Sequence, residues 1–216
     1  MVIVSAADPG CRTSPNEQDQ RHLANMLHIP LLDPATPQEA LEMSRFAFEL
    51  SECSKLPVIL RPTARICHTR SKVTFGSVRA PFVGGFRREA RFLPMPDMAS
   101  KLRLEITERL EAANGLLAGS GFNRRKGKSQ VAVLGTGVAA AICADVIQEQ
   151  GLDDRLTSLR LGVLHPLPED WLVEQLRDLE TVLVVEELSP YVEDAVRALC
   201  SLHGLDTKIL GKRTRH

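Results

Sequence analysis

Short aliphatic runs alternate with longer amphipathic stretches over the first 75 residues of the chain. Residues 2–7 form one aliphatic run, which the turn signal Asp8-Pro9-Gly10 closes, and residues 58–60 form another. Uncharged aliphatic runs of this kind are typical of buried strands. A polar string at residues 61–70 follows the second run. The pattern predicts strand, helix, short strand, helix and strand, in that order.

Both helices of this first part begin with the same capping signal. The segment Ser14-Pro15-Asn16-Glu17 combines an N-cap serine, a proline at the first helical position and a glutamate three residues after the cap. It predicts a helix that runs to about residue 28. The segment Thr36-Pro37-Gln38-Glu39 repeats the signal and predicts a longer helix, which Pro57 ends.

The pattern dissolves at residues 76–128, where prolines and glycines interrupt it and one helix is expected at residues 98–117. We interpret residues 76–128 as a linker and residues 129–216 as a second unit. Strands are expected there from residue 130 and at 156–163, 181–185 and 207–210, with helices to about 150 and at 168–179 and 190–202. Such alternation makes parallel βαβ units, so both halves are predicted to be α/β with a mainly parallel sheet.

The composition is that of a soluble globular chain. Of 216 residues, 44% are hydrophobic and 25% are charged, with 27 basic and 27 acidic residues. A net charge of zero gives no overall field that would gather nucleic acid or anionic lipid. The longest uncharged apolar stretch, at residues 131–144, is shorter than the about 18 residues that a membrane span needs. We therefore expect a cytoplasmic protein without nucleic acid or membrane as partner.

The five cysteines are scattered, and no two of them have the C-x-x-C spacing of metal or cluster ligands. Their apolar surroundings predict reduced, mostly buried thiols. We expect no metal and no iron–sulfur cluster on this chain.

Three motifs have both a functional and a structural interpretation. The stretch Gly135-Thr136-Gly137 follows a strand and opens a helix, as in dinucleotide-binding folds, but the next strand does not end in the acidic residue that would hold a ribose. The pair Glu186-Glu187 ends a strand, where its side chains point to opposite faces, which favours an interface or buried hydrogen-bonding role over acid–base chemistry. The basic run at residues 123–128 lacks interleaved aromatic residues, so we expect a solvated linker.

Two loops carry the candidate chemistry. Each follows a strand expected in the sheet, and each is dense in groups that bind a carboxylate or an amide. Structural roles as caps and turns remain open for both loops. The candidate residues are Arg12, Thr13, Ser14, Asn16 and Gln18 at residues 8–19, and Arg61, Thr63, Arg65 and His68 at residues 61–70.

The same segments resemble a known family. The stretch ADPG…NEQD at residues 7–19, continued by LPVILRPTARICHTR at 56–70, resembles the α subunit of indolepyruvate ferredoxin oxidoreductases. The segments GTGVA, LGVLHPLPEDW, EELSPYVED and KILGKR, in this order, are similar to the transketolase C-terminal-like domain of that subunit. The resemblance covers nearly the whole chain apart from residues 76–128.

The resemblance implies an enzyme that depends on thiamine diphosphate and Mg. Such enzymes oxidatively decarboxylate a 2-oxo acid, an aryl pyruvate, to an acyl group on coenzyme A and pass the electrons through iron–sulfur clusters to ferredoxin, with a β subunit as partner. This chain is then expected to be a fragment: residues 1–75 as the C-terminal half of a pyrimidine-binding domain, and residues 129–216 as the transketolase C-terminal-like domain. The activating glutamate is expected upstream of Met1 and the clusters elsewhere, so no cofactor and no catalytic residue is expected on this chain alone.

The residues that the resemblance places near substrate or cofactor are Ser14, Asn16, Gln18, Arg61, Thr63, Arg65 and His68. Arg61 or Arg65 is expected to bind the substrate carboxylate by a bidentate fork. Where the family usually has Ser-Gln-Asn, this chain has proline at position 15, which removes an amide side chain and an N–H donor. The alternatives are a non-catalytic assembly module of a multi-subunit oxidoreductase and an NAD-binding protein.

Overall fold

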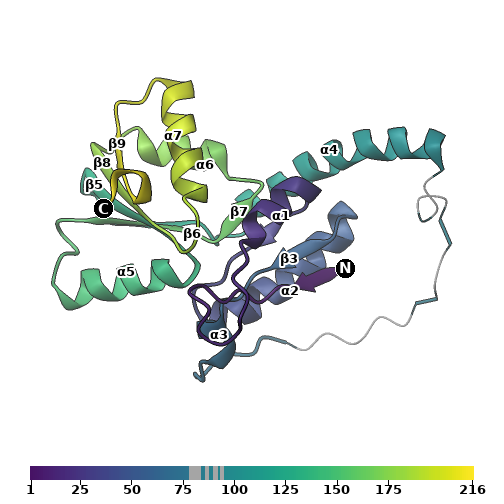
Figure 1. Ribbon diagram of the computed structural model, residues 1–216, viewed down its shortest axis with the longest axis horizontal. Coiled ribbons are helices and arrows are strands. Elements are labelled where there is room, and N and C mark those ends of the chain that lie inside the picture. The colour runs from purple at the N-terminus through teal and green to yellow at the C-terminus, as the bar shows by residue number, and fades with distance from the viewer. Residues whose placement is uncertain (78–83, 86–87, 90–91, 93–94) are drawn as a thin grey trace.

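The fold consists of two sheets with helices on both sides (Figure 1). The computed structural model describes residues 1–77, 84–85, 88–89, 92 and 95–216. Within these residues the strands form a four-stranded sheet of order β1-β3-β2-β7 and a five-stranded sheet of order β4-β6-β5-β8-β9. The strands that make the first sheet are β1 (Val2–Val4), β2 (Leu31–Leu32), β3 (Val58–Leu60) and β7 (Val163–His165).

The predicted order of the first 75 residues is confirmed. The strands β1, β3 and β2 pair in parallel, and the helices α1 (Gln20–Leu27) and α2 (Pro37–Ser54) connect them. Helix α2 begins as expected, because the Thr36 hydroxyl accepts a hydrogen bond from the Glu39 amide at 3.2 Å. The polar string after β3, expected as a loop, contains the short helix α3 (Ala64–His68).

Two expectations for the start of the chain are wrong. Strand β1 is not buried: it is an edge strand that pairs with β3, and Val4 is 65% exposed. The segment Ser14-Pro15-Asn16-Glu17 does not cap α1, which begins six residues after Ser14. Asp19 is the cap, since its carboxylate accepts from the Arg21 amide at 3.3 Å.

The second sheet follows the predicted alternation closely. Helix α5 (Gly137–Glu149) lies alone on one face of the sheet in the described part of the chain, and α6 (Glu169–Leu176) and α7 (Tyr191–His203) cover the other (Figure 1). A 3-10 turn follows the last strand at Lys212–Thr214. The strands of this sheet are β4 (Arg124–Lys126), β5 (Val131–Thr136), β6 (Thr157–Leu161), β8 (Thr181–Val185) and β9 (Lys208–Leu210).

The strand expected at residues 156–163 breaks at Gly162 into β6 and β7. A Cβ atom on Gly162 would lie 2.8 Å from both the Met43 Cε and the Phe122 carbonyl oxygen, so the close approach requires glycine. Strand β7 then leaves the second sheet and pairs antiparallel with β2 of the first. The basic run expected as a solvated linker is β4, which pairs antiparallel with β6. Both departures depend on partners distant in sequence.

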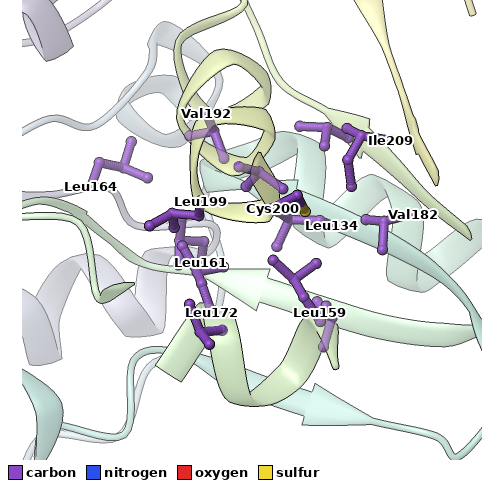
Figure 2. Close-up of a cluster of buried hydrophobic side chains, with 14 of the residues drawn as sticks. Leu134, Leu159, Leu161, Leu164, Leu172, Val182, Val192, Leu199, Cys200 and Ile209 are labelled. Carbon is purple, nitrogen blue, oxygen red and sulfur yellow. The ribbon is translucent and has the colours of Figure 1, made fainter. Parts of the chain in front are cut away.

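The apolar core joins the two sheets. Leucines of β5 and β6 pack under α6 and α7 (Figure 2), and the same cluster continues into Leu31 and Ile59 of the first sheet. A second cluster, on the other face of the first sheet, holds Met43 of α2 together with Leu117. Leu117 belongs to α4 (Pro96–Ala118), the helix expected between the two units, which packs on α2. Parts of the predicted linker, at residues 78–83, 86–87, 90–91 and 93–94, lie outside the described residues.

The cysteines are less buried than expected. Cys11, Cys53 and Cys67 are exposed, Cys143 is intermediate and Cys200 is buried. The expectation of mostly buried thiols is therefore wrong, because three of the five lie on the outer side of a loop or helix. None of the helices in the described ranges is long and apolar enough to cross a membrane.

Candidate interdomain site

The two loops with the candidate chemistry leave the first sheet side by side. Ala7 forms a parallel bridge with Thr63. The Ala7 amide donates to the Pro62 carbonyl at 2.9 Å, and the Ala64 amide donates to the Ala7 carbonyl at 2.7 Å. Because these bonds lie at the carboxyl ends of β1 and β3, the loop at residues 8–19 and the segment at residues 61–70 share one edge of the sheet.

Two carboxylates hold the loop at residues 8–19 in shape. Asp8 Oδ2 accepts from the amides of Thr13 and Ser14, both at 2.6 Å, and Glu17 Oε1 accepts from the Gly10 amide at 2.5 Å. The hydrogen bond from the Thr13 amide lowers the pKa of Asp8 below its ordinary value. The loop therefore uses Glu17 to close on itself, which explains why the predicted capping box does not form.

The predicted site residues divide into an exposed and a buried group. The exposed ones are Ser14, Asn16, Gln18, Arg65 and His68. Arg61 and Thr63 are only 2% and 1% exposed. The exposed group is open to a ligand, whereas the buried pair lies beneath the loops.

Arg61 is held in a buried ion pair. Its Nη1 lies 3.1 and 3.2 Å from the two carboxylate oxygens of Asp33, and its Nε donates to the Gln20 side chain at 3.3 Å. Burial raises the pKa of Asp33, and the Arg61 guanidinium opposes that rise. The Nη2 group of Arg61 and the hydroxyl of Thr63 have no partner within the described residues, although both are buried. These two groups are polar atoms left for a ligand or water at this edge.

The second sheet meets the same edge through Gly137 and Glu186. A Cβ atom on Gly137 would lie 2.6 Å from Asp33 Oδ2, and the residue has a φ of +47°. Glu186 accepts from Arg21 Nη1 at 2.5 Å and from the Val192 and Glu193 amides at 3.0 and 2.9 Å. The first turn of α7 and helix α1 are thus tied to each other by one buried carboxylate.

Arg21 is the cation that links α1 to the start of α7. Its Nη2 group donates to Asp19 at 2.6 Å, and to the carbonyls of Glu187 and Ser189 at 2.8 and 3.0 Å. Burial raises the pKa of Asp19, but the hydrogen bonds from Arg21 and Ser189 outweigh it and hold the pKa well below the ordinary value. The two sheets are therefore joined by an ionised network rather than by apolar contact alone.

Glu187 follows Glu186 directly, beyond the end of β8 at Val185, and is half-buried. Burial raises the pKa of Glu187, which lies in the fields of Arg61, Asp33 and Arg65. Glu186 has the buried hydrogen-bonding role that the sequence favoured.

The glycines of the GTG motif serve packing. A Cβ atom on Gly135 would lie 2.5 Å from the Ala140 Cα, so this glycine allows α5 to approach its own strand. The Asp33 carboxylate faces Gly137 at the start of α5, where a dinucleotide fold would place a pyrophosphate. Because an anion already lies there, the geometry disfavours NAD binding.

Sequence reasoning missed the charged residues beneath the loops: Asp8, Asp19, Arg21, Asp33 and Glu39 of the first sheet's loops and helices, and Arg160 of the second sheet. One signal was present, since Asp33 ends an aliphatic strand immediately before Pro34, at a carboxyl edge of the sheet. Glu39 forms an ion pair with Arg160 that joins α2 to β6, and burial lowers the pKa of Arg160 to about 10. No periodicity pairs residues this far apart in sequence.

The described part of the chain contains no group of three His, Cys, Asp or Glu side chains that could hold a metal ion. The acidic side chains at the junction are instead committed to arginines and backbone amides, as with Asp33 and Glu186.

The chain is similar to a known oxidoreductase subunit. It is 40% identical over 217 aligned residues to the indolepyruvate oxidoreductase subunit IorA of Methanothermobacter marburgensis, a match that covers 98% of this chain and 35% of that protein. The chain therefore spans about a third of the length of the curated relatives that it matches. No family model matches the chain.

Two solved structures share the fold. A 2-oxoglutarate:ferredoxin oxidoreductase from Magnetococcus marinus, with 2-oxoglutarate, coenzyme A and succinyl-CoA bound, aligns with a TM-score of 0.66 at 14% identity over 97% of this chain and 45% of the other. A split-gene transketolase, an inactive β4 tetramer, aligns with a TM-score of 0.53 at 17% identity over 97% of this chain and 56% of the other. The predicted α/β, transketolase-like architecture is confirmed.

Proposed function

We propose that this chain, a homologue of about a third of the indolepyruvate oxidoreductase subunit IorA, supplies the substrate-facing edge of a 2-oxoacid:ferredoxin oxidoreductase. In the complete enzyme an aryl pyruvate is oxidatively decarboxylated to an acyl-coenzyme A, and the electrons pass to ferredoxin. A β subunit is the partner in this assembly, and the cytoplasm is its location. The chain alone is inactive in this proposal.

One observation carries the proposal. The loops at residues 8–19 and 61–70 begin as neighbours at the carboxyl edge of a parallel sheet, through the bridge between Ala7 and Thr63. Ligands of α/β proteins bind at such edges, because the loops there converge from several strands. The exposed side chains of both loops, including Gln18 and Arg65, then face a common ligand.

The two arginines at this edge, Arg61 and Arg65, have different roles in binding a 2-oxo acid. The guanidinium of Arg61 is bound to Asp33 through Nη1, so it offers only its Nη2 group. Arg65 is exposed, and within the described residues no ion pair occupies it. Arg65 therefore binds the substrate carboxylate through two parallel N–H bonds. Arg61, bound to Asp33, forms the buried base of the site.

The remaining residues of the two loops orient the substrate. The amide of Gln18 and the side chains of Ser14, Asn16 and His68 are donors or acceptors for the carbonyl and ring of the aryl pyruvate. Thr63 contributes a buried hydroxyl without a partner in the described residues. Each residue acts by hydrogen bonding alone, so none of them is assigned a covalent step.

Thiamine diphosphate with Mg does not fit the described residues by themselves. Mg²⁺ takes oxygen ligands, and the described ranges hold no group of three His, Cys, Asp or Glu side chains that could bind it. The free polar atoms at the edge, Arg61 Nη2 and the Thr63 hydroxyl, suit a carboxylate rather than a cation. In this proposal other parts of the complete enzyme hold the thiamine cofactor and the iron–sulfur clusters.

The proposal is tested with the intact homologous enzyme in a viologen-reduction assay with indolepyruvate and coenzyme A. Replacing the residue equivalent to Gln18 with alanine is expected to lower turnover about fivefold to thirtyfold, since a hydrogen bond to the reacting substrate is worth about 1–2 kcal/mol. The equivalent of Glu52→Ala, on an exposed turn of α2, is the matched control. Unchanged turnover in the Gln18 variant would count against the site, and viologen reduction by the 216-residue chain alone would refute its incompleteness.

A further inference from the structure

A separate cavity of about 700 Å³ opens beside α1. Residues of α1, α4, the turn between β7 and α6, the first turns of α6 and α7, and the 3-10 turn with Arg213 line it. The lining groups that bear on its chemistry are His22, Asn114, His165, Glu169, Asp170 and Tyr191. None of the predicted site residues lines this cavity, so it needs an explanation of its own.

His165 presents a hydrogen-bond acceptor to the cavity. The residue is only 8% exposed, and its Nδ1 lies 2.9 Å from the carbonyl oxygen of Ile29. A carbonyl only accepts, so Nδ1 carries the proton and Nε2 is left with a lone pair. Burial lowers the pKa of His165, which keeps the ring neutral near pH 7. No partner for Nε2 is found within the described residues.

The other charged groups leave the cavity acidic. Asp194 is neutralised by Arg213, whose Nε and Nη2 lie 2.9 and 2.6 Å from its two carboxylate oxygens. Glu169 and Asp170, in the first turn of α6, are exposed and have no ion-pair partner among the described residues. Two free carboxylates on the lining make it attractive to a cation and repel an anion.

His22 is engaged in a hydrogen bond with Ser189. The Ser189 hydroxyl donates to Asp19 at 2.5 Å, so at 2.9 Å it accepts from His22 Nε2. The Nε2 donor of His22 is thus taken by Ser189, which is itself hydrogen-bonded to Asp19. The rest of the lining is apolar or amide, with the ring of Tyr191, the side chain of Leu167 and the amide of Asn114.

We propose that this cavity binds a primary ammonium group on a short apolar stem. The lining offers three acceptors for the three N–H bonds of an ammonium: the carboxylates of Glu169 and Asp170 and the Nε2 atom of His165. The stem lies against Leu167 and the Tyr191 ring. The ligand class is therefore a small alkyl or aralkyl amine, and the site is independent of the 2-oxo acid edge.

The probe is benzylamine, and the matched neutral probe is benzyl alcohol, which has the same shape without the charge. Binding to the full 216-residue chain at pH 7.5 and low salt is measured by calorimetry. Benzylamine is expected to bind saturably, and benzyl alcohol at least tenfold more weakly. The Nε2 resonance of His165 in ¹⁵N NMR spectra is expected to move with benzylamine, which a purely surface electrostatic effect would not produce.

The variant E169Q/D170N removes the charge and keeps the shape, and is expected to weaken benzylamine binding at least tenfold. The matched control E174Q/D178N removes two carboxylates from the same helix and its following turn, none of which lines the cavity. Unchanged NMR and circular dichroism spectra establish that both variants are folded. Equal loss in the two variants, equal binding of the two probes, a His165 resonance that does not move, or no saturable binding would each overturn the proposal.

Discussion

Arg21 lies between the two sheets with a side chain that is 1% exposed, and it binds Glu186, whose side chain is equally enclosed. A buried pair of this kind adds little stability against a well-packed apolar substitute, because both ions have lost their water. Its removal from one side only is costly, since the remaining charge stays buried without a partner. Arg21 therefore fixes the position of α1 relative to α7.

Replacing Arg21 with alanine is expected to lower the free energy of unfolding by about 3–5 kcal/mol, because Glu186 and Asp19 lose their cation. The measurement is urea unfolding followed by circular dichroism. Arg155→Ala is the matched control: this arginine is exposed, and its change is expected to stay within about 0.5 kcal/mol. Equal losses of unfolding free energy in the two variants would contradict this role of Arg21.

Asp19 makes the stability of this network depend on pH. Its pKa in the folded protein lies below the ordinary value of 3.8, so the stabilisation is present above that value and is lost as the pH falls below it. Between about pH 5 and pH 3 the wild-type chain is expected to lose more unfolding free energy than Asp19→Asn, which has no such proton to bind. The surface variant Asp206→Asn is expected to follow the wild-type curve, and a curve for Asp19→Asn as steep as that of the wild type would refute the assignment.

Among the helices and strands, the start of α5 lies against Asp33 of the first sheet. Gly137 has a positive φ and faces the Asp33 carboxylate, so any side chain there is both strained and crowded. Gly151, just beyond the end of the same helix, has a similar φ of +60°, and a Cβ atom added there would meet nothing within 4 Å. The two glycines separate the cost of backbone strain from the cost of contact.

Both glycine-to-alanine substitutions are expected to destabilise the chain by roughly 1–2 kcal/mol through the left-handed backbone alone. Gly137→Ala is expected to cost about 1–3 kcal/mol more, because its Cβ atom meets Asp33. Urea unfolding of the two variants gives the difference directly. If Gly151→Ala were as costly as Gly137→Ala, the contact between α5 and Asp33 would not be tight.

The elements that could be predicted from the sequence are those fixed by local signals. Aliphatic runs placed β3, β5 and β8, and Thr36 with Pro37 placed the start of α2. The signal at Ser14 failed because Asp8 and Glu17 bind the loop's own amides, which no local rule for caps anticipates. Strand β7 could not be predicted as a separate strand because it pairs with β2, more than a hundred residues away.

Across the chain as a whole, the two sheets share one apolar cluster and one ionised network. Neither half therefore has a complete core of its own. The strand-and-loop pattern indicated the two candidate loops and the resemblance selected residues in them, and the structure adds which of these residues are accessible. Arg61 could be named from the sequence as a carboxylate ligand, but its burial with Asp33 depends on three strands meeting at one edge. Arg65, four residues further along the chain and in α3, is the accessible cation.

In the proposed enzyme, the edge shared by the two loops holds the carboxylate of a 2-oxo acid, with Arg65 as its exposed ligand. The decisive quantity is the kcat/KM of the intact homologous enzyme for its aryl pyruvate after Arg65→Ala at the equivalent position, beside Lys72→Ala as an exposed control in the same stretch. A charge-assisted pair is worth about 1.5–3 kcal/mol, so we expect a loss of about tenfold or more for Arg65→Ala and no change for Lys72→Ala. An unchanged kcat/KM in the Arg65 variant would contradict this role of the edge.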